Sequence, residues 1–166
     1  MTTRKLTVLF TPLDGWGHIN ACHGLADELK RRGHRVVFAV DKAFEGKLLP
    51  FGFEECIHGL KVDGEADEYW PEFVKKNGQC FKEEPIVIVE KFLVIAMTKM
   101  FADNKEREAQ YKEIIEKVKP DLIVTDNYVN MPTITNCGIP WVWLFSAAVH
   151  FALNDDDRIP PPWAGM

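Results

Sequence analysis

Residues 10–40 read FTPLDGWGHINACHGLADELKRRGHRVVFAV, and this stretch decides the fold that we expect. An apolar, β-branched run at 5–11 predicts a strand buried on both faces. Apolar residues spaced three and four positions apart predict an amphipathic helix over 18–32, which Gly33 would end. A second apolar run at 34–40 predicts another strand. Strand, glycine-containing loop, helix and strand together form a βαβ unit with a right-handed crossover.

The rest of the chain continues this alternation of strands and helices. Further strands are expected at 53–59, 121–126 and 140–146. Helices are expected at 42–50, 70–77, 85–118 and 131–138, with a long loop over 60–84 and a break in the longest helix near Asp103 and Asn104. Five strands separated by helices predict an α/β doubly wound parallel sheet of order 3-2-1-4-5. Such sheets bind ligands at the carboxyl ends of the strands, where the chain reverses direction.

The composition indicates one globular domain and excludes several classes of function. A length of 166 residues fits a single domain with a core, and a net charge of −5 without a clustered basic face argues against nucleic-acid binding. No stretch reaches about 18 apolar residues, so no membrane span is expected. The start has no apolar signal region, and the four cysteines lack metal-ligand spacing. We therefore expect a cytoplasmic protein with reduced thiols and no metal.

A histidine and a carboxylate are the main candidates for catalysis. His18 lies where the first long helix begins, and Asp126 is the last residue of the fourth expected strand. The predicted strand order brings both residues to the same edge of the sheet, although they are far apart in sequence. A carboxylate on one ring nitrogen would leave the other nitrogen free as a base. The alternatives are an N-cap role for Asp126 and a solvated helix-start residue for His18.

Other motifs give weaker signals. Gly15-x-Gly17 lacks the third glycine of a dinucleotide-binding loop, and the loop pattern does not support Asp41 as a ribose-binding acid. No G-x-S-x-G motif marks a nucleophilic serine. We interpret His23 as structural or solvated and His58 as a loop residue. Two further histidines, at the start of a strand and near the end of the chain, are His34 and His150.

Four short motifs follow one another in order between residues 5 and 148. They are Gly17-His18 after the first strand, L-x-x-R-G-H-x-V at 29–36, P-D-x-[IV]-x-x-D at 120–126 and G-I-P at 138–140. Together they resemble the amino-terminal half of the UDP-glycosyltransferases, which are inverting sugar transferases with two Rossmann-like domains (the GT-B fold). One difference is Ala21, which stands where the family commonly has proline.

The resemblance implies a mechanism and a set of binding residues. His18, paired with Asp126, would remove the proton from the acceptor hydroxyl, whose oxygen would displace UDP with inversion. No cofactor and no metal would be needed, because the UDP-sugar, most commonly UDP-glucose, is a co-substrate. Gly15 and Gly17 would let the donor phosphates approach the helix start. A small lipophilic acceptor would meet side chains from several loops, namely Trp16, Phe81, Phe92, Met97, Asn127 and Ser146.

The resemblance also implies that the chain is part of a larger enzyme. Residues 1–166 would form an incomplete amino-terminal acceptor-binding domain, and the carboxyl-terminal domain that holds the UDP-sugar would be absent. Because catalysis by positioning needs both reactants held together, we expect the isolated chain to be inactive. The alternative function is a non-catalytic module of Rossmann-like fold that binds a small apolar ligand, and a sugar-nucleotide epimerase is a more remote one.

Overall fold

The computed structural model describes residues 4–59 and 69–147. The chain divides into two compact units. The described part of the first unit comprises residues 4–59 and 104–146, and the second unit is described mainly by residues 69–103. The predictions for the first part of the 60–84 loop and for His150 lie outside the described residues.

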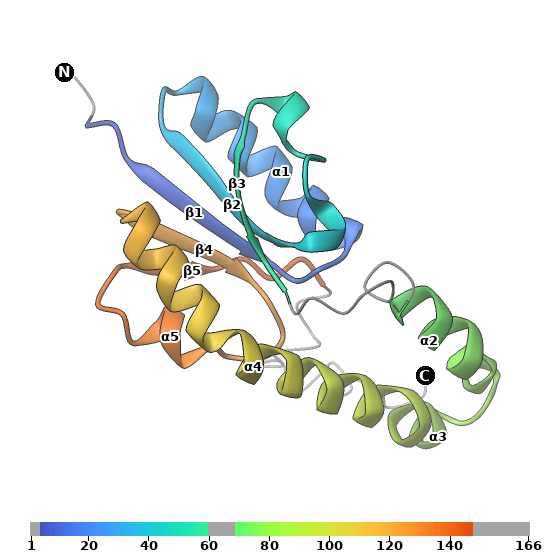
Figure 1. Ribbon diagram of the computed structural model, residues 1–166. Coiled ribbons are helices and arrows are strands. Elements are labelled where there is room, and N and C mark those ends of the chain that lie inside the picture. Colours follow the sequence, from blue (N-terminus) through green and yellow to red (C-terminus); the bar gives the residue numbers. More distant parts are fainter. Residues whose placement is uncertain (1–3, 60–68, 148–166) are drawn as a thin grey trace, which may run out of the picture. The chain divides into compact units, whose positions relative to one another are not determined.

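The first unit contains a five-stranded parallel sheet (Figure 1). Its strands are β1 (Thr7–Pro12), β2 (Arg35–Asp41), β3 (Glu54–His58), β4 (Leu122–Asp126) and β5 (Trp141–Trp143). The strand order β3-β2-β1-β4-β5 and the parallel pairing confirm the predicted doubly wound sheet. In the register, Pro12 lies opposite Asp126 and Asp41 lies opposite His58. The carboxyl ends of these four strands therefore meet at one edge.

Helices cover both faces of this sheet (Figure 1). Because side chains alternate along a strand, Val8 and Phe10 of β1 pack with α1 (Trp16–Arg31), whereas Leu9 faces the opposite side. On that side the core is completed by the carboxyl-terminal part of α4 (Val94–Val118) and by α5 (Pro132–Thr135). The α4 residues in this core are Tyr111, Ile114, Ile115 and Val118.

The predicted helix over 42–50 is divided in the structure. Two 3₁₀ turns, η1 (Lys42–Phe44) and η2 (Leu49–Phe51), take its place. Gly46 lies between them with a φ of +78°, a left-handed conformation that an α-helix cannot contain. The single helix expected here is therefore wrong, and β2 joins β3 through two short turns.

The second unit is helical in its described part. It comprises α2 (Tyr69–Asn77), the 3₁₀ segment η3 (Gly78–Lys82), α3 (Pro85–Ile88), the π-helical turn η4 (Val89–Leu93) and the beginning of α4. The break predicted near Asp103 is wrong, because α4 is continuous there. Its 25 residues contain neither glycine nor proline, and Lys99 forms an ion pair with Asp103 one turn later. The irregularity lies earlier, in η4.

Two further observations bear on the composition-based expectations. Among the described residues, no helix combines the length and the apolar character that crossing a membrane requires. All four cysteines are free thiols: Cys22, Cys56, Cys80 and Cys137.

Candidate active site

The loop between β1 and α1 presents His18 at the carboxyl edge of the sheet. The strand ends at Pro12, and the helix begins after Gly15, whose carbonyl accepts a hydrogen bond from the Ile19 N–H at 3.0 Å. The Leu13 N–H donates to the Asp126 carbonyl at 2.7 Å, which fixes the loop against the end of β4. Among the described residues, no side chain caps the first turn of α1. The backbone N–H groups of that turn therefore keep their partial positive charge.

The structure brings the two catalytic candidates together. The Nδ1 atom of His18 lies 2.9 Å from Oδ2 of Asp126. The Asp126 side chain is only 3% exposed, whereas 18% of the His18 side chain remains accessible. The carboxylate is thus held in the interior, and the imidazole stays within reach of a ligand. This is the juxtaposition that the strand order predicts.

Ser146 and Tyr128 complete the surroundings of His18. The Ser146 hydroxyl lies 3.0 Å from His18 Nδ1, and the Ser146 N–H donates to Oδ1 of Asp126 at 3.3 Å. The Tyr128 ring packs edge-on against the imidazole, with centroids 5.4 Å apart. In the described part of the chain, both polar contacts of the His18 ring are made at Nδ1. This arrangement leaves Nε2 as the nitrogen available for chemistry.

Electrostatics keep Asp126 ionised and keep its neighbours Cys22 and Tyr128 protonated. Burial works to raise the pKa of Asp126, but hydrogen bonds from His18 and Ser146 outweigh it and lower that pKa below its ordinary value of 3.8. Burial, helped by the Asp126 charge, raises the pKa of the Cys22 thiol to about 12. The same two causes raise the pKa of Tyr128. Cys22 is therefore a neutral core residue and not a nucleophile.

Three of the predicted acceptor-binding residues lie in the first unit. Trp16 opens α1, is 48% exposed and packs edge-on against Phe44 at 5.3 Å. The amide oxygen of Asn127 accepts hydrogen bonds from within the first unit, from Asn104 Nδ2 at 3.3 Å and the Val129 N–H at 3.0 Å. Ser146 contacts the His18–Asp126 pair, as described above. Their contact with an acceptor stays a prediction.

The other three predicted acceptor-binding residues lie in the second unit. Phe92, in η4, packs against Phe73 and Phe81 with ring centroids 5.0 and 4.7 Å apart. Phe81 is exposed, and Met97 on α4 is half-buried. The three phenylalanines form an aromatic cluster within their own unit. Their role in acceptor binding stays a prediction.

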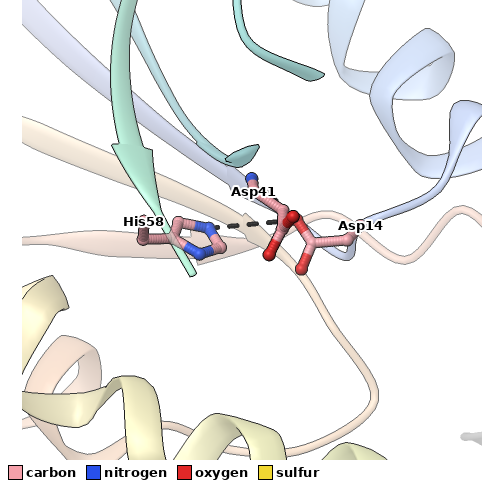
Figure 2. Close-up of side chains that lie close together, drawn as sticks. All are labelled: Asp14, Asp41 and His58. Carbon is pink, nitrogen blue, oxygen red and sulfur yellow. Dashed lines mark hydrogen bonds and ion pairs between the residues drawn. The ribbon is translucent and has the colours of Figure 1, made fainter. Parts of the chain in front are cut away.

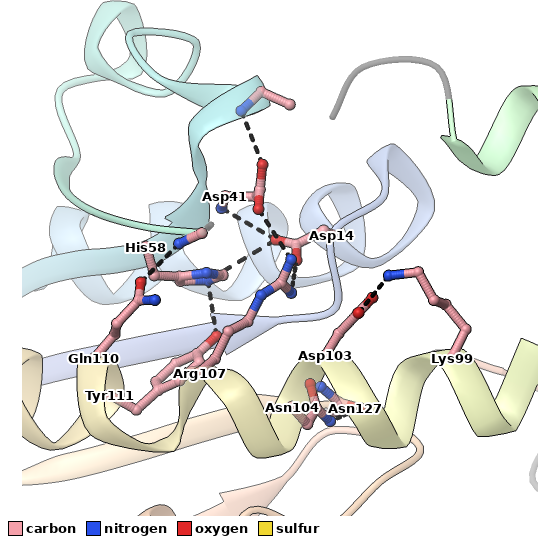
Figure 3. Close-up of polar contacts among 12 residues, drawn as sticks. Asp14, Asp41, His58, Lys99, Asp103, Asn104, Arg107, Gln110, Tyr111 and Asn127 are labelled. Atoms are coloured by element: carbon pink, nitrogen blue, oxygen red, sulfur yellow. Dashed lines mark hydrogen bonds and ion pairs between the residues drawn. The ribbon is translucent and has the colours of Figure 1, made fainter. Parts of the chain in front are cut away.

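A second polar cluster occupies the same edge of the sheet, and sequence analysis missed it. We call it the Arg107 cluster; its members are Asp14, Asp41, His58, Arg107 and Tyr111 (Figure 3). The placement of His58 in a loop is wrong. His58 is the last residue of β3 and is buried, because the β2–β3 pairing continues to its register partner Asp41. The edge argument that identifies Asp126 could also have found Asp41 and His58.

Arg107 on α4 joins two carboxylates in this cluster. Its Nη1 forms an ion pair with Asp14, and its Nη2 lies 3.0 Å from Oδ2 of Asp41. The Asp41 N–H donates to Asp14 Oδ1 at 3.1 Å, and the other Asp41 oxygen accepts from the Ala43 N–H at 3.1 Å. Asp41 is therefore engaged by protein groups on both oxygens, and a ribose hydroxyl would have to compete with them.

His58 is a neutral imidazole within this cluster. Its Nε2 is 2.8 Å from the Tyr111 hydroxyl and 3.9 Å from Asp14 Oδ1. Burial, followed by the nearby Arg107 charge, lowers the pKa of His58 from 6.5 to about 3. Burial likewise raises the pKa of Tyr111. Arg107 is thus the cationic group of the cluster at neutral pH.

The spacing of three of these side chains is compatible with a cation. Asp14, Asp41 and His58 can each offer one ligand atom, and these atoms lie within 4.8 Å of one another (Figure 2). However, the guanidinium of Arg107 already binds both carboxylates. A metal ion would have to displace it, so the donor set does not favour a metal centre here.

Comparisons with known proteins identify the fold. No model of a protein family and no curated protein matches the sequence. Among solved structures, Arabidopsis thaliana UGT89C1 is similar with a TM-score of 0.62 at 15% identity, over 92% of this chain and 38% of that one. The kitacinnamycin glycotransferase is similar with a TM-score of 0.59 at 19% identity, over 87% of this chain and 31% of that one. CalG4, the calicheamicin glycosyltransferase, is similar with a TM-score of 0.58 at 22% identity, over 92% of this chain and 32% of that one.

These similarities concern the fold. The chain has the Rossmann-like fold found in the amino-terminal domain of GT-B glycosyltransferases. It spans about a third of the length of the solved structures that it matches.

Proposed function

We propose that this chain is the amino-terminal, acceptor-binding part of a UDP-glycosyltransferase. The whole enzyme would transfer a sugar, with glucose the first candidate, from UDP to a hydroxyl group of a small lipophilic acceptor. The observation that carries the proposal is the His18–Asp126 pair at the carboxyl ends of β1 and β4. The shared fold with glycosyltransferases supports it.

The geometry of the pair fits a general base. An ionised Asp126 can only accept a hydrogen bond, so His18 carries its proton on Nδ1 and has a basic lone pair on Nε2. Nε2 would take the proton from the acceptor hydroxyl as its oxygen attacks the anomeric carbon. The bond from that carbon to UDP breaks, UDP leaves with the electron pair, and the configuration inverts. Asp126 would stabilise the imidazolium that forms. These steps use no metal and no cofactor.

The start of α1 is suited to the donor phosphates. Its first turn contains no acidic residue, and none of the described side chains caps it, so the turn favours an anion. A Cβ atom added at Gly17 would meet no atom of the described residues within 4 Å, and one at Gly15 would meet only the His18 ring, at 3.8 Å. Space beside the backbone is therefore available at both glycines. The rest of the donor site would come from the part of the enzyme beyond this chain.

The test uses the full gene product that contains this chain. UDP release from UDP-glucose would be followed with a panel of phenolic acceptors for the natural protein and for His18→Ala. We expect turnover to fall by about 10²- to 10⁴-fold, the usual contribution of a general base, with acceptor binding retained. His23→Gln is the matched control, since His23 lies on the same helix and packs between Phe51 and Phe53. Undiminished turnover in His18→Ala would remove the proposed role.

A further inference from the structure

The β1–α1 loop links the Arg107 cluster to the catalytic pair. Asp14 belongs to the cluster and lies four residues before His18, in the short connection between Pro12 and the first turn of α1. We propose that Arg107 is a positioning residue that holds Asp14 against Asp41 and thereby sets the place of His18 opposite Asp126. The positional claim stands on the contacts below, and its catalytic consequence rests on the proposed function.

The Arg107 clamp is largely removed from water. The side chains of Arg107, Asp14 and Asp41 are 16%, 13% and 10% exposed. A guanidinium bound to carboxylates by two separate nitrogens is a directional, charge-assisted contact. Removing one member of such a pair leaves the others with uncompensated charge in a poorly solvated place. Among the contacts of the described residues, Arg107 and the Asp41 N–H are what hold the Asp14 carboxylate in place.

The charges of the cluster make this dependence stronger. The carboxylates of Asp14 and Asp41 each offer an oxygen within 4.8 Å of the other, and His58 beside them is held neutral by burial. Within the cluster, Arg107 supplies the positive charge that lets the two carboxylates approach. Without it, repulsion would drive Asp14 towards solvent, and the loop that carries it would follow.

Within the described residues the loop is anchored at Leu13 and at Asp14, and the Arg107 clamp is part of the second anchor. The Leu13 N–H bonds to the Asp126 carbonyl at 2.7 Å, which ties the loop to β4. Asp14 follows Leu13. Its carboxylate contacts β2, through the Asp41 N–H, and α4, through Arg107. The loop between these anchors and α1 is too short to absorb a shift of Asp14. A displacement would reach the first turn of α1 and lengthen the 2.9 Å contact between His18 and Asp126.

The direct test observes His18 in this chain and does not require turnover. NMR spectra of ¹⁵N-histidine-labelled protein at neutral pH would report the Nδ1–H of His18 that faces Asp126. We expect Arg107→Gln to shift and broaden the His18 signals and Arg107→Lys to restore them in part. The control is Arg35→Gln, because Arg35 also uses two nitrogens, here to bind the one carboxylate of Glu54, at the opposite ends of β2 and β3. His18 signals that match the natural protein in folded Arg107→Gln would overturn the proposal.

A milder variant covers the case in which Arg107→Gln does not fold. Asp14→Asn keeps an oxygen for the Asp41 N–H, leaves the Arg107–Asp41 pair in place and removes only the ionic link to the loop. We expect the same His18 signals to move, with a smaller amplitude. A folded Asp14→Asn chain with unmoved His18 signals would count against the proposal as directly as the first result.

Turnover of the full gene product separates this proposal from the proposed function. A displaced base is expected to lower kcat of Arg107→Gln by about 10- to 100-fold, with KM for the acceptor changed far less, while Arg35→Gln is unaffected. Lost turnover with unmoved His18 signals would refute positioning and leave the transferase function in place. The reverse result combines His18 signals that move in Arg107→Gln with a natural full gene product that releases no UDP. It would refute the transferase function and leave the positioning role intact.

Discussion

Two histidines, His18 and His58, lie beside aspartates at the same edge of one sheet. They differ in their access to solvent and in their contact with the carboxylate. His18 keeps 18% of its side chain accessible and has a carboxylate 2.9 Å from Nδ1. His58 is fully buried, bonds to Tyr111 and lies 3.9 Å from its nearest carboxylate, which Arg107 already neutralises. The position at a strand end therefore does not make a base. Access to solvent, and a carboxylate in direct contact with a ring nitrogen, distinguish His18 from His58.

The largest effect should come from changing the partner of His18. In Asp126→Asn the amide can donate to Nδ1, which would place the ring proton on Nε2 and remove the base. We expect turnover of the full gene product to fall by at least about 10²-fold, as measured by UDP release. Asp27→Asn, an exposed carboxylate on α1, is the control. Near-normal turnover in Asp126→Asn would mean that the two histidines do not differ through their carboxylates.

The next largest effect is a loss of folding stability at acidic pH, caused by His58. The pKa of His58 is about 3 in the folded chain and 6.5 ordinarily, because burial and then the Arg107 charge disfavour its cation. As the pH falls below 6.5, the unfolded chain takes up this proton and the folded chain does not. The contribution of His58 is therefore complete above pH 6.5 and is lost towards pH 3, by about 1.4 kcal/mol per pH unit.

Urea denaturation between pH 7.5 and pH 4.5 measures this loss. The natural chain should lose stability over this range, and His58→Asn should start less stable but lose less on acidification. Parallel curves for the two chains would show that His58 is not the buried, neutral group described here.

The contrast between the two sites also separates what the sequence predicts from what it does not. The edge that joins His18 to Asp126 follows from the strand order, which the βαβ pattern and the later strands predict. Arg107 could not be found in this way, because an arginine in a long helix is usually solvated and its contact depends on how α4 is rotated over the sheet. The two 3₁₀ turns after β2 likewise depend on one backbone angle, at Gly46. The acceptor-binding set remains a prediction because side chains from two separate units make it up.

A smaller effect tests how tightly the Arg107 cluster is packed. Gly59 follows β3 with a φ of +123°, and a Cβ there would lie 2.6 Å from Oδ2 of Asp41. Gly59→Ala should therefore destabilise the chain by about 1–3 kcal/mol, from backbone strain plus displacement of the carboxylate. Gly46→Ala, at φ +78°, has a smaller backbone penalty and meets no described atom within 4 Å, so it gives the cost of a left-handed alanine without a contact. Gly59→Ala should therefore be the more destabilising change, and equal unfolding free energies would contradict the close contact with Asp41.

The smallest effect on stability should occur at Gly17. There a substitution is expected to affect donor binding but not the unfolding free energy. Nothing in the described structure contacts a methyl group there, and Gly17 lies in the first turn of α1. Gly17→Ala should therefore leave the unfolding free energy unchanged or raise it by about 0.5 kcal/mol, since alanine restricts the unfolded chain. If donor phosphates approach this turn, the same methyl group should raise KM for UDP-glucose several-fold in the full gene product. Gly24→Ala, in the middle of the same helix and equally unobstructed, provides the control for helix stabilisation alone. An unchanged KM in Gly17→Ala would place the phosphates elsewhere, while the base assigned to His18 would be unaffected.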